Sequence, residues 1–127
     1  MMMFCCEAKN TSPEILSFIL GYKPKINLQD SIGRTALHLA CRAGRADLVK
    51  ILVKVPNIDV NRRTCGGETP LMSAAQSGNI FTVGECLNNN FNPFFQNSLH
   101  MTARDFAAYF PNVYGHSLQS VIDTAMQ

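Results

Sequence analysis

His38 and Cys41 are the residues of this chain whose types and spacing could carry out chemistry. They lie three positions apart in the segment GRTALHLACRAG, residues 33–44, and on a helix this spacing places both side chains on one face. An imidazole beside a thiol can generate a nucleophilic thiolate, but it also needs a third, orienting group and an open cleft. Cys41 falls where a small, core-facing residue is expected. The segment therefore predicts a buried, inert thiol, a structural histidine and no catalytic residue.

The other patterns that would bind a metal or a cofactor do not occur in the sequence. Five cysteines and three histidines are scattered without a C-x-x-C pair or another closed set of zinc ligands. We find no glycine-rich phosphate loop, no paired catalytic carboxylates and no G-x-S-x-G elbow. We expect no metal, no cofactor and no small-molecule substrate, and nothing in the sequence supports an enzyme.

The segment around His38 is one copy of a repeated unit. DSIGRTALHLACRAGRADLVKILV, which starts at Asp30, aligns with TCGGETPLMSAAQSGNIFTVGECL, which starts at Thr64, with a period of 34 residues. A weaker third copy, NSLHMTARDFAA, starts at Asn97 after a spacing of 33. Upstream, EILSFILGYKPKIN matches the second half of the unit. Half a repeat therefore precedes the first complete one.

Each complete copy predicts two short antiparallel helices joined by a tight glycine turn. Thr35 and Thr69 suit the N-cap, and Pro70 suits the first helical position, where its missing N–H is harmless. One such pair is too small to bury its own apolar face, so it must stack on its neighbours. Small residues such as Ala40 and Ala74 permit the close approach that stacking requires.

The period and the segments TALHLA and TPLMSAA resemble the ankyrin repeat. The resemblance implies an all-α ankyrin-repeat solenoid with short β-hairpin fingers, and His38 occupies the repeat's own histidine position, within reach of the next finger's backbone. It departs from the pattern at Arg104, where a core leucine is expected, at His100, where the turn glycine is expected, and at an insertion near residues 111–114. The expected organisation is one domain, 1–127, with a partial repeat at 1–29, repeats at 30–63 and 64–96, and an irregular C-terminal capping repeat at 97–127.

Asparagines precede the predicted fingers and should hold them. Asn27 and Asn61 lie three residues before the start of successive units, and we expect both to hydrogen-bond to the backbone of these turns. The segment IDVN, residues 58–61, resembles the finger segment in which ankyrin asparagines are hydroxylated, with Leu52 as the upstream leucine. Asn61 is therefore a candidate modification site.

Composition and charge narrow the class of protein. Hydrophobic residues make up 46% of the 127 and charged residues 16%, which favours a folded domain. The net charge of +2 conceals an asymmetry, since residues 1–63 hold ten Lys and Arg against five acids and residues 64–127 hold one Arg against four. The sequence shows no signal-peptide pattern and no transmembrane segment. We expect an intracellular protein, soluble or peripheral in a complex, most simply cytoplasmic.

The resemblance implies a non-catalytic module that binds a protein partner with its finger tips and the exposed side of its inner helices. We expect a small adaptor or constitutive subunit of a multiprotein assembly; the alternatives are a regulatory inhibitor that covers an enzyme surface and a weak nucleic-acid binder that uses the basic half. A partner with acidic groups beside an apolar ridge would fit the charge asymmetry. The C-terminal aromatic residues either cap the stack or bind. The candidate binding residues are Ser31, Ile32, Arg34, Arg42, Arg62, Arg63, Glu68, Gln76, Phe95, Leu99, Met101, Tyr109 and Phe110.

Overall fold

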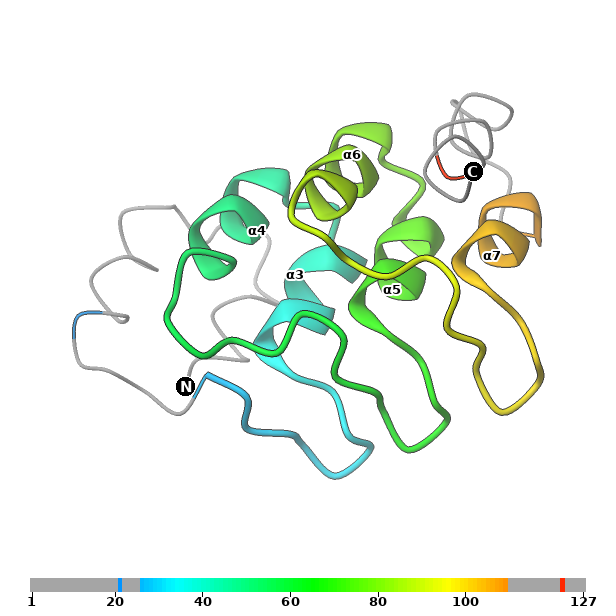
Figure 1. Cartoon of the computed structure of the whole chain (residues 1–127), viewed down its shortest axis with the longest axis horizontal. Coiled ribbons are helices and arrows are strands. Elements are labelled where there is room, and N and C mark those ends of the chain that lie inside the picture. Colours follow the sequence, from blue (N-terminus) through cyan, green and yellow to red (C-terminus); the bar gives the residue numbers. More distant parts are fainter. Residues whose placement is uncertain (1–20, 22–25, 110–121, 123–127) are drawn as a thin grey trace.

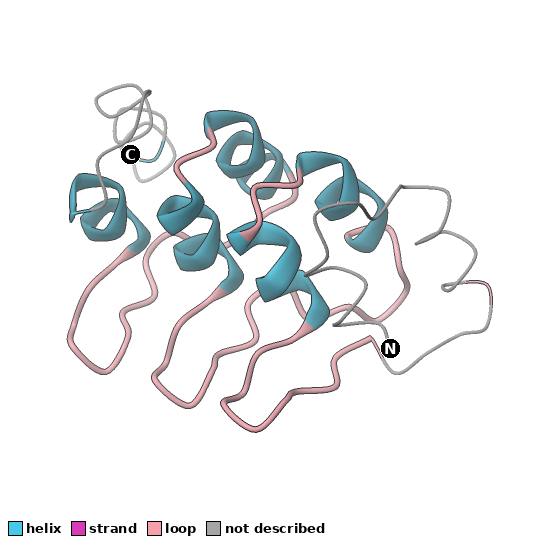
Figure 2. Cartoon of the chain, turned by 180° about the vertical axis from the view of Figure 1, so that it is seen from behind, coloured by secondary structure: helices cyan, strands magenta, loops and turns pink. Residues whose placement is uncertain are grey.

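Two rows of short helices lie above a row of projecting loops (Figure 1). The computed structural model describes residue 21, residues 26–109 and residue 122. The inner row contains α3 (Ala36–Arg42), α5 (Pro70–Ser77) and α7 (Ala103–Tyr109), and the outer row contains α4 (Ala46–Leu52) and α6 (Ile80–Asn88). These described residues include no strand, so the loops that we predicted as hairpins are hydrogen-bonded turns (Figure 2). The all-α stack of helical pairs is confirmed.

The inner helices begin where the sequence predicts. Thr35 caps α3: its side-chain oxygen accepts a hydrogen bond from the backbone N–H of His38, whose ring nitrogen accepts one from the backbone N–H of Thr35. Thr69 caps α5 by accepting from the backbone N–H of Met72, and Pro70 takes the first helical position. Each cap satisfies a backbone donor that the first turn leaves unpaired.

The turn between the two helices of a pair is fixed by glycine and by asparagine. Gly44 and Gly78 have φ values of +71° and +75°, in the left-handed region that ends a helix at low cost. Asn79 caps α6 through its side-chain oxygen, which accepts from the backbone N–H groups of Phe81 and Thr82. Its side-chain amide donates to the carbonyl of Gly44 at 3.1 Å. The turn of one pair is thereby joined to the turn of the next.

Equivalent small residues pack where successive helical pairs meet. Ala40, Ala74 and Ala107 occupy the same position on α3, α5 and α7, and each is at most 2% exposed. Val49 and Val83 repeat in the same way on α4 and α6. Only a small side chain lets the inner helices approach closely, so these alanines set the spacing of the stack. Other fully buried core residues are Leu37, Cys41, Leu48, Leu52, Leu71 and Cys86.

The third copy departs from the first two at its start. Arg104 is only half-buried, whereas Leu37 and Leu71, its counterparts in the first two copies, are fully buried. Asp105, at the position of His38, accepts from the backbone N–H of Thr102 at 2.9 Å, and its own backbone N–H donates to the hydroxyl of Thr102, the N-cap residue of α7, at 3.4 Å. Most of the partial repeat predicted at 1–29, namely residues 1–20 and 22–25, and the insertion near residues 111–114 lie outside the described residues.

Candidate partner-binding surface

The three loops stand side by side and are tied together through their backbones (Figure 1). We call them fingers, residues 30–34, 64–68 and 97–101. The backbone N–H of Cys65 in the second finger donates to the carbonyl of Ile32 in the first at 3.0 Å. In the same way Ser98 of the third finger donates to Gly66 of the second at 2.9 Å. Each finger therefore supports its neighbour at its tip.

Every finger is a closed turn that needs a left-handed residue at the same place. Gly33 and Gly67 have φ values of +86° and +81°, and His100 takes this place in the third finger with φ +63°. A Cβ atom on Gly33 would lie 2.7 Å from the backbone nitrogen of Cys65, so the first turn also requires the absence of a side chain. The side-chain oxygen of Asn97 accepts two backbone N–H groups of the third finger. These turns hold their tips in one conformation.

His38 links the first helix to the second finger, as predicted. Its Nε2 lies 2.9 Å from the carbonyl oxygen of Glu68, which can only accept, so Nε2 carries the proton. Its Nδ1 then accepts from the backbone N–H of Thr35 at 3.2 Å and from its hydroxyl at 2.9 Å. Burial lowers the pKa of His38, although the hydrogen bond to Glu68 acts in the opposite direction. His38 is a neutral structural bridge whose two ring nitrogens are both engaged.

Cys41 faces a different neighbour. Its sulfur lies 3.6 Å from the sulfur of Cys86 on α6, and both thiols are fully buried. The prediction of a buried thiol is confirmed, and the imidazole and the thiol on α3 do not form a catalytic pair. Among the described residues, no group of three or more His, Cys, Asp or Glu side chains could hold a metal ion. None of the described helices has the length and apolar character needed to cross a membrane.

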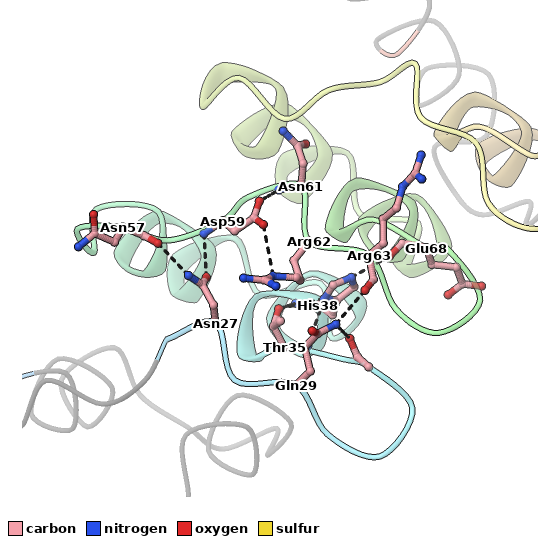
Figure 3. Close-up of polar contacts among 11 residues, drawn as sticks. Asn27, Gln29, Thr35, His38, Asn57, Asp59, Asn61, Arg62, Arg63 and Glu68 are labelled. Atoms are coloured by element: carbon pink, nitrogen blue, oxygen red, sulfur yellow. Dashed lines mark hydrogen bonds and ion pairs between the residues drawn. The ribbon is translucent and has the colours of Figure 1, made fainter.

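Asn27 and Asn61 hydrogen-bond to backbone groups, but in the loops that lead into the fingers and not in the fingers that we predicted them to hold (Figure 3). Asn27 donates to the carbonyl of Asn57 at 2.8 Å and accepts from the backbone N–H of Asp59 at 2.7 Å. One repeat later, the side-chain oxygen of Asn61 accepts from the backbone N–H of Asn92 at 2.9 Å. The candidate modification site thus lies half-buried between two repeats, with its amide oxygen in use.

Apolar residues occupy two of the three finger tips. Ile32 is 53% exposed and Leu99 is 74% exposed, and the equivalent position in the second finger is Gly66. Ser31, beside Ile32, is also exposed. The tips therefore form a short row, with apolar side chains at both ends and bare backbone between them. Large apolar side chains exposed on a rigid edge are typical of an interaction site.

Two of the arginines that we predicted to contact a partner form ion pairs with carboxylates of this chain. Arg34 pairs with Asp30 at 2.8 Å and Arg62 pairs with Asp59 at 3.3 Å. Arg63 is exposed, with its guanidinium 4.6 Å from the centre of the Phe95 ring. A cation beside an aromatic face keeps its charge, so Arg63 remains an available cation held in place by the loop before the third finger.

The inner helices add one cation to this face. Arg42 is exposed in the last turn of α3, and Gln76 lies half-buried at the equivalent position of α5. Within the described residues Arg42 has no ion pair. Glu68 is half-buried, and its carboxylate points away from the bridge that its carbonyl makes to His38 (Figure 3).

The aromatic residues near the C-terminus divide between core and surface. Phe91 is 2% exposed and packs in the core, while Phe94, which the sequence did not single out for binding, is 58% exposed. Met101 was predicted as a contact but is half-buried and packs against the core. Tyr109 ends α7 with its side chain outside the described structure, and Phe110 lies outside it altogether.

A comparison with known proteins supports the repeat assignment. A family model of ankyrin repeats in three copies matches residues 2–97. The photoreceptor ankyrin repeat protein of Homo sapiens is 42% identical over 82 residues, which is 62% of this chain and 18% of the relative. The SMC5-SMC6 complex localization factor protein 1 of Bos taurus is 34% identical over 80 residues, 63% of this chain and 7% of the relative. The chain thus spans less than a fifth of the length of these relatives.

Proposed function

Since this chain belongs to the ankyrin repeat family, a family of protein-interaction modules, we propose that it is an adaptor or constitutive subunit that binds its partner along the finger row. The observation that carries the proposal is the pair of exposed apolar tips, Ile32 and Leu99, on fingers joined by backbone hydrogen bonds. Residues held in one conformation lose little entropy when they bind, so even a small apolar contact can contribute to affinity.

Two exposed charges, one next to the finger row at Arg63 and one at the far end of α3 at Arg42, indicate the partner's chemistry. Arg42 and Arg63 are the exposed cations of the candidate set, whereas Arg34 and Arg62 already face carboxylates. We infer a protein segment that presents apolar side chains to the finger tips and carboxylates to these two arginines. Because carboxylates partly neutralise the basic half, this arrangement does not favour binding to nucleic acid.

The test is site-specific photo-crosslinking in cells that express the native protein. A photoreactive residue is placed at Ile32 or Leu99 on the finger row, or at Lys54 beyond the end of α4 as a control. The proposal expects a discrete crosslinked protein from both finger positions and none from Lys54. Crosslinks from Lys54 alone, or an RNA adduct in place of a protein, would contradict it.

Affinity for the captured partner then separates the two kinds of contact. Replacing Ile32 and Leu99 together with serine removes the apolar tips, and Arg42→Glu with Arg63→Glu reverses the charges. We expect each pair to weaken binding at least roughly tenfold. Lys54→Glu is the matched charge control, and it should leave affinity unchanged. An affinity that none of these variants alters would refute the finger-row proposal.

We also propose Asn61 as a site of asparagine hydroxylation. It lies between two repeats, and its amide oxygen already accepts a hydrogen bond from Asn92. A hydroxyl on its Cβ would leave that bond in place. Peptide mass spectrometry of the native protein should show one added oxygen on Asn61 and none in an Asn61→Gln variant. An unmodified peptide from cells with active hydroxylase would contradict this assignment.

A further inference from the structure

A groove lies on the other side of the stack, between the outer helices α4 and α6. These helices form the row away from the fingers (Figure 1). The groove has a volume of about 760 Å³. Its walls are apolar where Ile51 faces Ile80 and Phe81, and Phe81 is 70% exposed. The residues proposed for binding along the finger row do not line this groove.

Gly84 holds the groove open at the middle of α6. A Cβ atom placed on it would meet no atom within 4 Å, and its φ is not in the left-handed region. Neither packing nor backbone conformation within the described chain therefore requires glycine here. Glycine inside a helix is unfavourable compared with alanine. A position that lowers helix stability and leaves open space beside an exposed phenylalanine indicates close approach by another molecule.

Each wall carries one charged side chain that lies in no ion pair among the described residues, and the two charges are opposite in sign. Lys50 on α4 and Glu85 on α6 both line the groove. Neither belongs to an ion pair within the described residues, whereas the neighbouring Asp47 pairs with Arg45 at 3.0 Å. Lys50 is exposed, and Glu85 is half-buried. The groove therefore offers a cation on one side and an anion on the other.

The 34-residue period aligns these charges for self-association. It places Lys50 of α4 level with Gly84 of α6, directly before Glu85. A two-fold axis along the groove would lay α4 of one copy over α6 of the other at the same height. Lys50 of each copy would then enter the space left by Gly84 and meet Glu85 of the other copy. A two-fold interface makes each such contact twice. A partner whose charges are all of one sign could pair with Lys50 or with Glu85, but not with both.

We propose that this chain forms a two-fold dimer through the groove between α4 and α6, with a second copy of itself as the occupant. Two reciprocal Lys50–Glu85 pairs set the register, and the exposed Phe81 rings are covered. Nine residues of each copy line the groove, which is few for an interface, so the dimer is weak and forms in the micromolar range. The finger rows of both copies stay open, so the inference does not depend on the proposed function.

Charge exchange tests the pairing. Sedimentation equilibrium of the purified full chain is measured across the micromolar range for the native protein, Lys50→Glu, Glu85→Lys and the double variant. The native protein should dimerise, and each single reversal should weaken association at least roughly tenfold because like charges then face each other. The double variant restores opposite charges and should recover the native dissociation constant to within roughly threefold. Lys54→Glu, the same change outside the groove, should associate like the native protein.

A second variant tests the space at Gly84. Gly84→Leu points a side chain into the open groove, where its Cβ has no neighbour within 4 Å in its own copy, so far-ultraviolet circular dichroism and thermal unfolding should show an intact fold. Association should be lost. The proposal is overturned if the native chain is monomeric throughout the range. It is also overturned if both single reversals dimerise like the native protein, if the double variant fails to recover, or if Gly84→Leu dimerises normally.

Discussion

The bridge at His38 makes the stability of the stack depend on pH in a way that one substitution removes. We consider His38→Met, because Met72 occupies the equivalent position of α5 and is 1% exposed. A methionine therefore fits the site sterically. It removes the acceptor for the backbone N–H of Thr35 and the donor to the carbonyl of Glu68. Each buried group left unpaired costs about 1–3 kcal/mol, so the two together should cost about 2–6 kcal/mol at neutral pH.

The effect of acid follows from the pKa of His38. Burial holds this pKa below its ordinary value of 6.5, so His38 is protonated less readily in the folded protein than in the unfolded chain. The contribution of His38 to the free energy of unfolding is complete above pH 6.5, and it decreases as the pH falls toward the folded-state pKa. In His38→Met this decrease is absent. The difference in unfolding free energy between the two proteins should therefore shrink between pH 7.5 and 5.

Urea unfolding followed by circular dichroism at several pH values measures this difference directly. Other histidines are common to both proteins and cancel. The carboxylate of Asp47, whose pKa a hydrogen bond from Arg45 holds below 3.8, titrates outside this range. Met72→Leu is the control for altered packing; it should cost under about 1.5 kcal/mol at every pH. A difference between native and His38→Met that stays constant or widens in acid would refute the neutral bridge.

Four further substitutions have outcomes measurable by the same unfolding assay. Gly33→Ala should cost about 1–3 kcal/mol, since its Cβ would approach the backbone nitrogen of Cys65 to 2.7 Å at a positive φ; a neutral result would mean that the finger yields. Asn27→Ala should cost about 1–2 kcal/mol, because two hydrogen bonds between repeats are lost. Thr82→Val should stabilise the protein by about 1 kcal/mol, as the buried hydroxyl of Thr82 has no hydrogen-bond partner within the described structure. Gly84→Ala should add about 0.5–1 kcal/mol of helix stability, and a loss would show that the glycine serves its own chain.

Features that repeat in the sequence were predictable, because the same local physics acts in each copy. The N-caps Thr35 and Thr69 and the alanines at the helix contacts followed from spacing alone, and the structure confirms them. The bridge from His38 also followed, since a helix fixes its direction relative to the next finger.

Features that depend on side-chain choice in space were not predictable. Whether Arg34 and Arg62 face solvent or a nearby carboxylate is decided by turn geometry, and the sequence pattern alone suggested two open cations. Phe94 and Phe95 are adjacent in sequence, but one is exposed and the other packs half-buried beneath Arg63. In the sequence, Gly84 looks like any other residue of a helix, and only the structure shows the open space beside it.

The first copy has His38 where the second copy has Met72, so the contacts between successive units differ in strength. The interface between the first and second units includes the buried imidazole of His38, which bonds to Glu68. The interface between the second and third units has the thioether of Met72 at the same place. Under tension applied along the stack, the described units should therefore separate first at the interface between the second and third units. The last helix would peel away while the first two pairs still hold, giving a mechanical order of release that equilibrium unfolding cannot reveal.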